Sequence, residues 1–144
     1  RIGDLSAISL QAAFQGGKAR QFRQRLAAGE LPTANCVRCL HLRRTSRAEA
    51  ADAAAQVELP SSIMVENTSV CNLRCISCPR DLLGTLRGRR MMSLADIERL
   101  AREMSHVGVR QVTYHHLGEP FLSKRLAQEI RQFEPNLFGQ FVLL

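Results

Sequence analysis

Tryptophan is absent from the 144-residue chain, and Tyr114 is its single tyrosine. Proteins that bind single-stranded nucleic acids by stacking depend on aromatic side chains, so this shortage argues against that mode of binding. Long apolar runs are also missing: the longest is Phe141–Leu144, whereas a membrane-spanning helix needs about 20 residues. Residues 1–20 carry charges and no apolar stretch typical of a secretion signal. We therefore expect a soluble, cytoplasmic protein with no membrane partner.

The remaining composition is that of a globular protein, with 45% hydrophobic and 23% charged residues. These fractions exclude a wholly disordered chain and a low-complexity one. The chain begins at Arg1 rather than at methionine, and it ends on an apolar run. Because chain ends are normally exposed, we expect this sequence to be a fragment of a longer protein.

The formal net charge is +7, and Lys18 and Lys124 are the only lysines among the basic residues. Clustered arginines can bind nucleic acid through its phosphates. With so few aromatic residues to accompany them, we favour a solvated, arginine-rich surface and do not expect nucleic acid as a partner. The three clusters are Arg20, Arg23 and Arg25; Arg43, Arg44 and Arg47; and Arg87, Arg89 and Arg90.

The five cysteines all lie between residues 36 and 78, and they give the strongest signal for function. Their number is odd and no secretion signal is present, so a disulfide framework is disfavoured. Close spacing in a chain expected to be cytosolic instead favours a metal centre. The cysteines are Cys36 and Cys39, in a C-x2-C pair, and Cys71, Cys75 and Cys78, in a C-x3-C-x2-C array.

The first 60 residues predict a small, mostly helical segment that contains the C-x2-C pair. A helix is expected over residues 7–28 with a break at Gly16-Gly17, followed by a loop over residues 30–43. The capping-box sequence Ser46–Glu49 predicts a second helix that ends near Gln56. That helix has little bulk to bury, so we expect it to be a linker. The predicted division is a Cys-containing segment over residues 1–44, a linker helix over 45–60 and a domain over 61–144.

Residues 61–144 alternate between strands and helices. Strands are expected at Ile63–Val65, at Val109–Tyr114 and from Phe141 onward, joined by two helices that Ser93 and Ser123 cap. This order predicts an α/β fold with a parallel sheet and right-handed crossovers. Three strands do not complete a sheet or barrel of this type. The apolar stripes are Leu94, Ile97, Ala101 and Met104 on the first helix, and Leu126, Ile130 and Phe133 on the second.

Spacing alone leaves two other interpretations of the C-x3-C-x2-C array. Intervals of four and three residues share one face of a helix, but Asn72, Ser77 and Pro79 argue against a buried helical stripe. A zinc site normally has four ligands, and the C-x2-C pair could supply the others. The segment between the two motifs is longer than is usual in zinc sites, and it is predicted to contain a helix.

The segment Ile63–Arg80, with its Cys-Asn-Leu-Arg-Cys core, resembles the cluster-binding segment of radical S-adenosylmethionine (SAM) enzymes. In that family a C-x3-C-x2-C loop after the first barrel strand holds a 4Fe–4S cluster. After the next strand, Leu117–Pro120 is similar to the Gly-Gly-Glu-Pro-like segment that binds the amino group of SAM. The resemblance implies an incomplete radical SAM (β/α) barrel over residues 61–144. Its implied site residues are Cys71, Cys75 and Cys78 on the cluster, and Ser77, Leu117, Gly118 and Glu119 on SAM.

The resemblance also implies a reaction and a partner. Three thiolates leave one iron without a protein ligand, and in the family that iron chelates SAM. Reductive cleavage of SAM gives a 5′-deoxyadenosyl radical, which abstracts hydrogen from the substrate. A flavodoxin- or ferredoxin-like donor of low potential is the expected electron source. We assign no catalytic acid or base, and we expect His115 and His116 to be structural.

The N-terminal segment is similar to the tail of a SPASM domain, which carries auxiliary iron–sulfur clusters in peptide- and protein-modifying radical enzymes. The similarity rests on Ile2–Leu5, Phe22-Arg23 and Gly29–Pro32 before the C-x2-C pair. It implies that Cys36 and Cys39 bind an auxiliary cluster, and that the intact enzyme modifies a peptide or protein. A local zinc site with His41, or no metal, remains open for this pair. The competing function is a non-enzymatic zinc- or iron–sulfur-binding module that contacts nucleic acid through its arginines.

Overall fold

The computed structural model describes residues 2–56, 58–76, 78–79, 84–86, 88, 90–114, 116–133 and 141–143. It divides the chain into two units of internally contacting residues, Arg1–Leu59 and Pro60–Leu144. No helix in the described ranges is long and apolar enough to cross a membrane.

The N-terminal unit begins with two helices, α1 (Leu10–Gln15) and α2 (Gly17–Ala27). The predicted break is confirmed, because Gly16 ends α1 and precedes α2. A side chain at this glycine would lie 2.6 Å from the carbonyl oxygen of Ala12. The predicted start at residue 7 is wrong: Ser9 caps α1 by accepting a hydrogen bond from the Ala12 amide (3.1 Å), so the helix begins at Leu10.

The capping box predicted before the third helix, α3 (Arg47–Ala55), is confirmed. Ser46 Oγ accepts from the Glu49 amide (3.2 Å), and Glu49 Oε2 accepts from the Ser46 amide (2.9 Å). The hydroxyl of Thr45, and then the amide and hydroxyl of Ser46, lower the pKa of Glu49 to about 2. The helix expected to be a linker packs against α2 inside the N-terminal unit.

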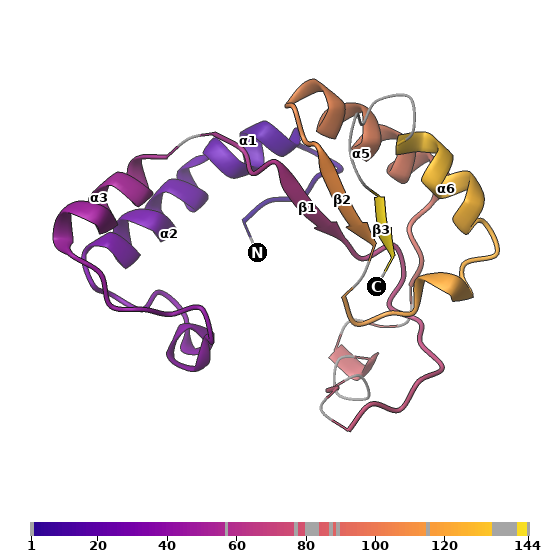
Figure 1. Ribbon diagram of the computed structural model, residues 1–144, viewed down its shortest axis with the longest axis horizontal. Helices are drawn as coiled ribbons and strands as arrows, with labels where there is room; N and C mark the ends of the chain where they lie inside the picture. Colours follow the sequence, from indigo (N-terminus) through magenta and orange to yellow (C-terminus); the bar gives the residue numbers. More distant parts are fainter. Residues whose placement is uncertain are drawn as a thin grey trace. The chain divides into compact units, whose positions relative to one another are not determined.

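The C-terminal unit is built on a parallel sheet of three strands, β1 (Ser62–Val65), β2 (Gln111–Tyr114) and β3 (Phe141–Leu143). The strands lie in the order β1-β2-β3, as predicted from the sequence, and Figure 1 shows them side by side. Val65 pairs with Tyr114, so β1 and β2 end together. A closed barrel remains a prediction.

Two helices form the crossovers, α5 (Leu94–His106) between β1 and β2, and α6 (Leu126–Phe133) between β2 and β3. Figure 1 shows both helices on the same side of the sheet. The Tyr114 ring meets the Phe133 ring edge to face, with centroids 5.8 Å apart, so alternate β2 residues face the helices. On the opposite face Met64 is 53% exposed. Within the described part of this unit, the buried apolar residues are Val65, Ile97, Ala101, Met104, Val109, Val112, Tyr114, Pro120 and Phe133.

The predicted stripe of α5 is confirmed, whereas that of α6 needs correction. Ile97, Ala101 and Met104 are buried on α5. On α6, Leu126 and Ile130 are only half-buried, and Glu129 is buried beside Phe133 instead. The helix also begins at Leu126, not directly after Ser123, whose hydroxyl donates to Glu129 Oε1 (2.6 Å).

Tyr114 provides a test of this packing, because it is the only tyrosine. Burial, and then the nearby Glu129 carboxylate, raise its pKa above the ordinary value of about 10. Because the fold favours the protonated form, its stabilising contribution is complete below pH ~10 and is lost as the pH rises further. We expect tyrosinate absorbance in an alkaline titration to appear together with loss of the helical circular dichroism signal. Ionisation at the ordinary pKa, with the fold intact, would contradict this packing.

Candidate cluster and cofactor site

The segment that joins β1 to the first cysteine of the array is fixed by a second piece of chain. Thr68 forms an antiparallel bridge with Met91. The Asn67 carbonyl accepts from the Met92 amide (2.8 Å). We call residues 67–70 and 90–92 the stem. The segment that carries Cys71, Cys75 and Cys78 begins after the first of these stretches and ends at the second.

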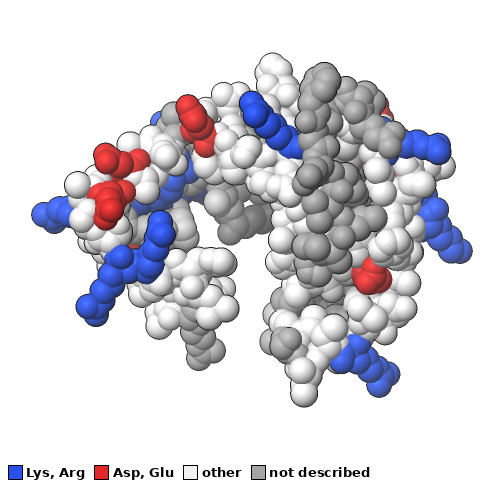
Figure 2. Space-filling view, in the orientation of Figure 1, with Lys and Arg blue, Asp and Glu red and all other residues white. Residues whose placement is uncertain are grey.

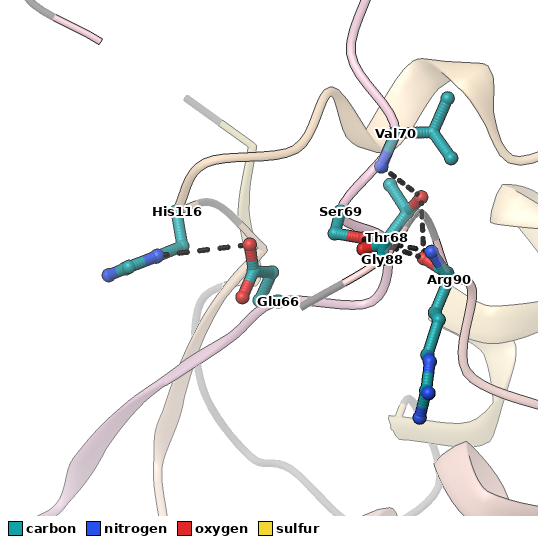
Figure 3. Close-up of polar contacts among 7 residues, drawn as sticks. All are labelled: Glu66, Thr68, Ser69, Val70, Gly88, Arg90 and His116. Atoms are coloured by element: carbon teal, nitrogen blue, oxygen red, sulfur yellow. Dashed lines mark hydrogen bonds and ion pairs between the residues drawn. The ribbon is translucent and has the colours of Figure 1, made fainter. Parts of the chain in front are cut away.

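Side chains reinforce the stem (Figure 3). Ser69 donates its amide to the Arg90 carbonyl (2.9 Å), and its Oγ accepts from the Arg90 amide (2.8 Å). The same hydroxyl donates to the Gly88 carbonyl (3.1 Å). Thr68 Oγ1 accepts from the Val70 amide (3.0 Å), which turns the chain toward the cysteines. Backbone hydrogen bonds therefore join the two ends of the cysteine-bearing segment to each other, next to the end of β1.

The turn after β2 lies directly against the stem. The Glu119 amide donates to the carbonyl of Val70 (2.8 Å), the residue before Cys71. Gly118 is so close to Thr68 that a Cβ atom would overlap the Thr68 carbonyl oxygen and lie 2.6 Å from its carbon. The structure thus brings the Leu117–Glu119 segment next to the start of the C-x3-C-x2-C array.

The Glu119 side chain is already engaged within its own turn. Its Oε1 accepts from the Phe121 amide (3.0 Å) and caps the 3-10 helix η2 (Pro120–Leu122). The Glu119 carboxylate therefore fixes the turn by capping η2.

The array itself is accessible. Cys75 is exposed, Cys71 and Cys78 are partly exposed, and none of the five cysteines forms a disulfide. The Cys78 amide donates to the Cys75 carbonyl (3.1 Å), and Cys71 Sγ accepts from the Leu73 amide (3.4 Å). Within the described residues, no three His, Cys, Asp or Glu side chains converge as a set of metal ligands. Ser77 and His115 lie outside the described residues.

The donor set nevertheless fits an iron–sulfur cluster. Cysteine thiolates are the usual ligands of such clusters, and three of them share one segment whose two ends are fixed by the stem. Ligand sites of this kind are commonly completed when the metal binds, because metal binding is coupled to folding.

Sequence reasoning missed Glu66, which follows β1 on the face of the sheet opposite the helices. Its Oε1 lies 3.9 Å from Nδ1 of His116, which follows β2 (Figure 3). The Glu66 side chain is 16% exposed and that of His116 50%, so the pair lies at the edge where both motifs begin. The available signal was the alternation of strand residues, which places Glu66 on the same side as Met64.

The C-x2-C pair lies in the N-terminal unit. Cys36 belongs to the 3-10 helix η1 (Ala34–Arg38), and Cys39 ends it. Cys36 Sγ is 3.2 Å from Thr33 Oγ1. His41 is exposed, and in the described part of the chain it does not form a three-residue ligand group with the two cysteines. The auxiliary cluster thus stays a prediction.

Described basic side chains occur on each of the two units, as Figure 2 shows. Arg43, Arg44 and Arg47 line a cavity of about 680 Å³ within the N-terminal unit, together with Leu26 and Leu42. Two residues of the third cluster, Arg87 and Arg89, are outside the described residues.

Comparison with known proteins points to the same class as the cysteine array. The similar curated proteins are GTP 3′,8-cyclases, which are radical SAM enzymes and support that class for this chain. The "Probable GTP 3′,8-cyclase" of Pyrococcus horikoshii is 35% identical over 75 residues, which are 52% of this chain and 23% of the relative. The "GTP 3′,8-cyclase" of Clostridium acetobutylicum is 34% identical over 68 residues, 47% of this chain and 21% of the relative. The "Probable GTP 3′,8-cyclase" of Methanopyrus kandleri is 36% identical over 73 residues, which are 51% of this chain and 23% of the relative.

These matches span about a quarter of the length of the relatives. No family model and no solved structure matches the chain. The comparisons support an iron–sulfur, SAM-dependent enzyme class and a β/α fold.

Proposed function

We propose that this chain contributes the part of a radical SAM enzyme that binds the 4Fe–4S cluster and SAM, with Cys71, Cys75 and Cys78 as cluster ligands. The hydrogen bond from the Glu119 amide to the Val70 carbonyl (2.8 Å) carries the proposal. It joins two motifs, 48 residues apart along the chain between Cys71 and Glu119, at the one sheet edge where a cofactor spanning both would lie.

The residues of the chain then have separate roles. When bound, the cluster and SAM supply one-electron chemistry that breaks a carbon–sulfur bond and begins hydrogen abstraction from the substrate. The three thiolates hold the cluster. Backbone atoms of Leu117 and Gly118 orient the amino group of SAM, and the Glu119 carboxylate keeps that turn in place by capping η2.

The surroundings of the cysteines support an electron-transfer role. Leu73 is 51% exposed and Ile76 fully exposed beside the ligands. Apolar side chains here would exclude water from the cluster and provide contact area for the low-potential flavodoxin- or ferredoxin-like donor that we propose as a partner.

For the intact protein we propose two alternative substrates. The SPASM-like segment favours a peptide or protein, and the name of the relatives favours GTP. Incubating the full-length, reduced enzyme with SAM and GTP distinguishes them. Consumption of GTP together with 5′-deoxyadenosine formation would identify GTP as the substrate. If GTP were not consumed, a peptide or protein substrate would be favoured.

Metal analysis after anaerobic reconstitution tests the proposed function against the zinc- or nucleic-acid-binding alternative. We expect iron and sulfide in the wild-type chain and their loss in Cys71→Ala. Zinc without iron or sulfide, unchanged by Cys71→Ala, would refute the cluster. A salt-dependent DNA affinity that requires Arg87, Arg89 and Arg90 would favour the alternative.

His116 is predicted to be dispensable for SAM cleavage. Its imidazole is half-exposed and lies 3.9 Å from Glu66, and the cluster ligands proposed above are the three cysteines. His116→Ala should leave the rate of 5′-deoxyadenosine formation within about twofold of wild type in the full-length enzyme, since surface substitutions usually have small effects. Loss of cleavage with a fully loaded cluster would show that this imidazole takes part.

A further inference from the structure

The buried carboxylate of Glu129 contacts the stem and has no role in the proposed binding of the cluster or of SAM. Glu129 on α6 is 1% exposed. Its Oε2 accepts from Asn67 Nδ2 (2.7 Å), and its Oε1 accepts from Ser123 Oγ (2.6 Å). Asn67 is itself 3% exposed and Ser123 6%. Both oxygens of a side chain that normally stays in water are thus held by neutral donors.

The partners of Glu129 link the parts of the candidate site. Asn67 is the first residue of the stem, and its carbonyl also accepts from the Met92 amide on the returning segment. Ser123 follows η2, which Glu119 caps. One carboxylate therefore connects the stem of the cysteine-bearing segment with the chain that follows the Leu117–Glu119 turn.

Burial alone does not account for a charged residue at this position. Replacing a buried charge and its partner by apolar residues is often neutral or stabilising, whereas removing one partner is costly. Phe133, four residues further along the same helix, is buried and shows that an apolar side chain fits this face. A leucine at position 129 could not accept the directional hydrogen bond from the side-chain amide of Asn67, which lies 62 residues earlier in the sequence.

We propose that Glu129 is a positioning residue for the cofactor site, which fixes the stem relative to the Gly118–Glu119 turn through its hydrogen bonds to Asn67 and Ser123. The inference rests on the proposed function for its consequence in SAM binding. The fixed geometry itself can be measured without any cofactor.

The test compares variants of equal packing but different hydrogen bonding. Asn67→Val/Glu129→Leu removes the carboxylate together with its Asn67 partner, so that no charge is left unpaired, and only the Ser123 hydroxyl loses an acceptor. Glu129→Gln can keep one acceptor for Asn67 and one donor for Ser123, and Glu98→Gln, on the exposed face of α5, is the matched control. Amide hydrogen exchange in the cluster-free chain is read at Ser69, Met92 and Glu119, the donors that join the stem and the turn.

We expect the double variant to melt near the wild-type temperature, yet to exchange these three amides about tenfold faster or more, with Ala101 in α5 unchanged. Glu129→Gln and Glu98→Gln should exchange like wild type. In the reconstituted protein, the double variant should need about tenfold more SAM to change the spectrum of the reduced cluster.

Wild-type exchange in a folded double variant would overturn the inference. If the double variant does not fold, amide exchange in the stem is compared between Glu129→Met and Glu129→Gln. The two new side chains are similar in size, and only glutamine keeps the hydrogen bonds. Equal stem exchange in that pair would likewise overturn the inference, and faster exchange in Glu129→Met alone would support it. A wild-type chain that binds no iron would refute the proposed function, while the exchange data would still report on Glu129.

Discussion

Replacing Cys75 by alanine is expected to abolish both the iron–sulfur cluster and SAM cleavage in the full-length protein. The array offers three thiolates, and within the described residues no group of three or more His, Cys, Asp or Glu side chains converges as an alternative metal site. Groups that merely support a metal ligand typically change affinity or activity by about 10–100-fold, so loss of a ligand should exceed about 100-fold. Iron and sulfide content and 5′-deoxyadenosine formation measure the two effects.

The controls separate loss of the cluster from loss of the fold. Cys75 is exposed and its side chain is not part of the buried core, so Cys75→Ala should leave the melting temperature of the cluster-free chain unchanged. Cys39→Ala, which removes a cysteine in the other unit, should retain the iron held by the array. A Cys75→Ala protein with full iron and sulfide would show that this thiol is not a ligand.

Replacing Gly118 by alanine is expected to displace the turn after β2 and to remove SAM binding. The added Cβ would overlap the Thr68 carbonyl oxygen and lie 3.2 Å from the Ser69 Cα. These are backbone atoms of the stem and cannot rotate away. Overpacking of this kind typically costs about 1–3 kcal/mol. The measurement is SAM binding by the reconstituted protein, together with the melting temperature of the cluster-free chain.

Gly84→Ala is the matched control for this substitution, because no atom of the described residues lies within 4 Å of the position where its Cβ would be built. It should bind SAM like wild type. If Gly118→Ala also bound SAM normally and melted normally, the close packing between the stem and the turn would be wrong.

The secondary structure of the C-terminal unit was largely predictable because its signals are local. Ser93 caps α5, and Gly108, with φ +77°, follows it, both as the sequence indicated. The apolar residues of α5 recur with helical spacing and are buried. The strand order followed from the alternation of strands and helices, since consecutive parallel strands usually lie side by side.

The contacts that build the site could not be predicted in the same way, because they are not local. The Thr68–Met91 bridge joins residues without any hydrophobic pattern to mark it. Glu129 interrupts the stripe formed by Leu126, Ile130 and Phe133, and a charged residue within a stripe is normally assigned to solvent. Only its distant partner Asn67 explains the burial, and a sequence gives no information on which polar residues meet across 62 positions.

The stem has a consequence for the entropy of assembling the ligands. Because Thr68 and Met91 are already paired, gathering three thiols restricts only the segment over residues 69–90 between them, and not the three strands or the helices α5 and α6. The free energy of closing a flexible segment rises slowly with its length, by about 0.6 kcal/mol for each doubling. The stretch beyond Pro79 can therefore lengthen or shorten at small thermodynamic expense. A change in the length of this segment can therefore alter which molecules reach the cysteine ligands without disturbing the three-stranded sheet.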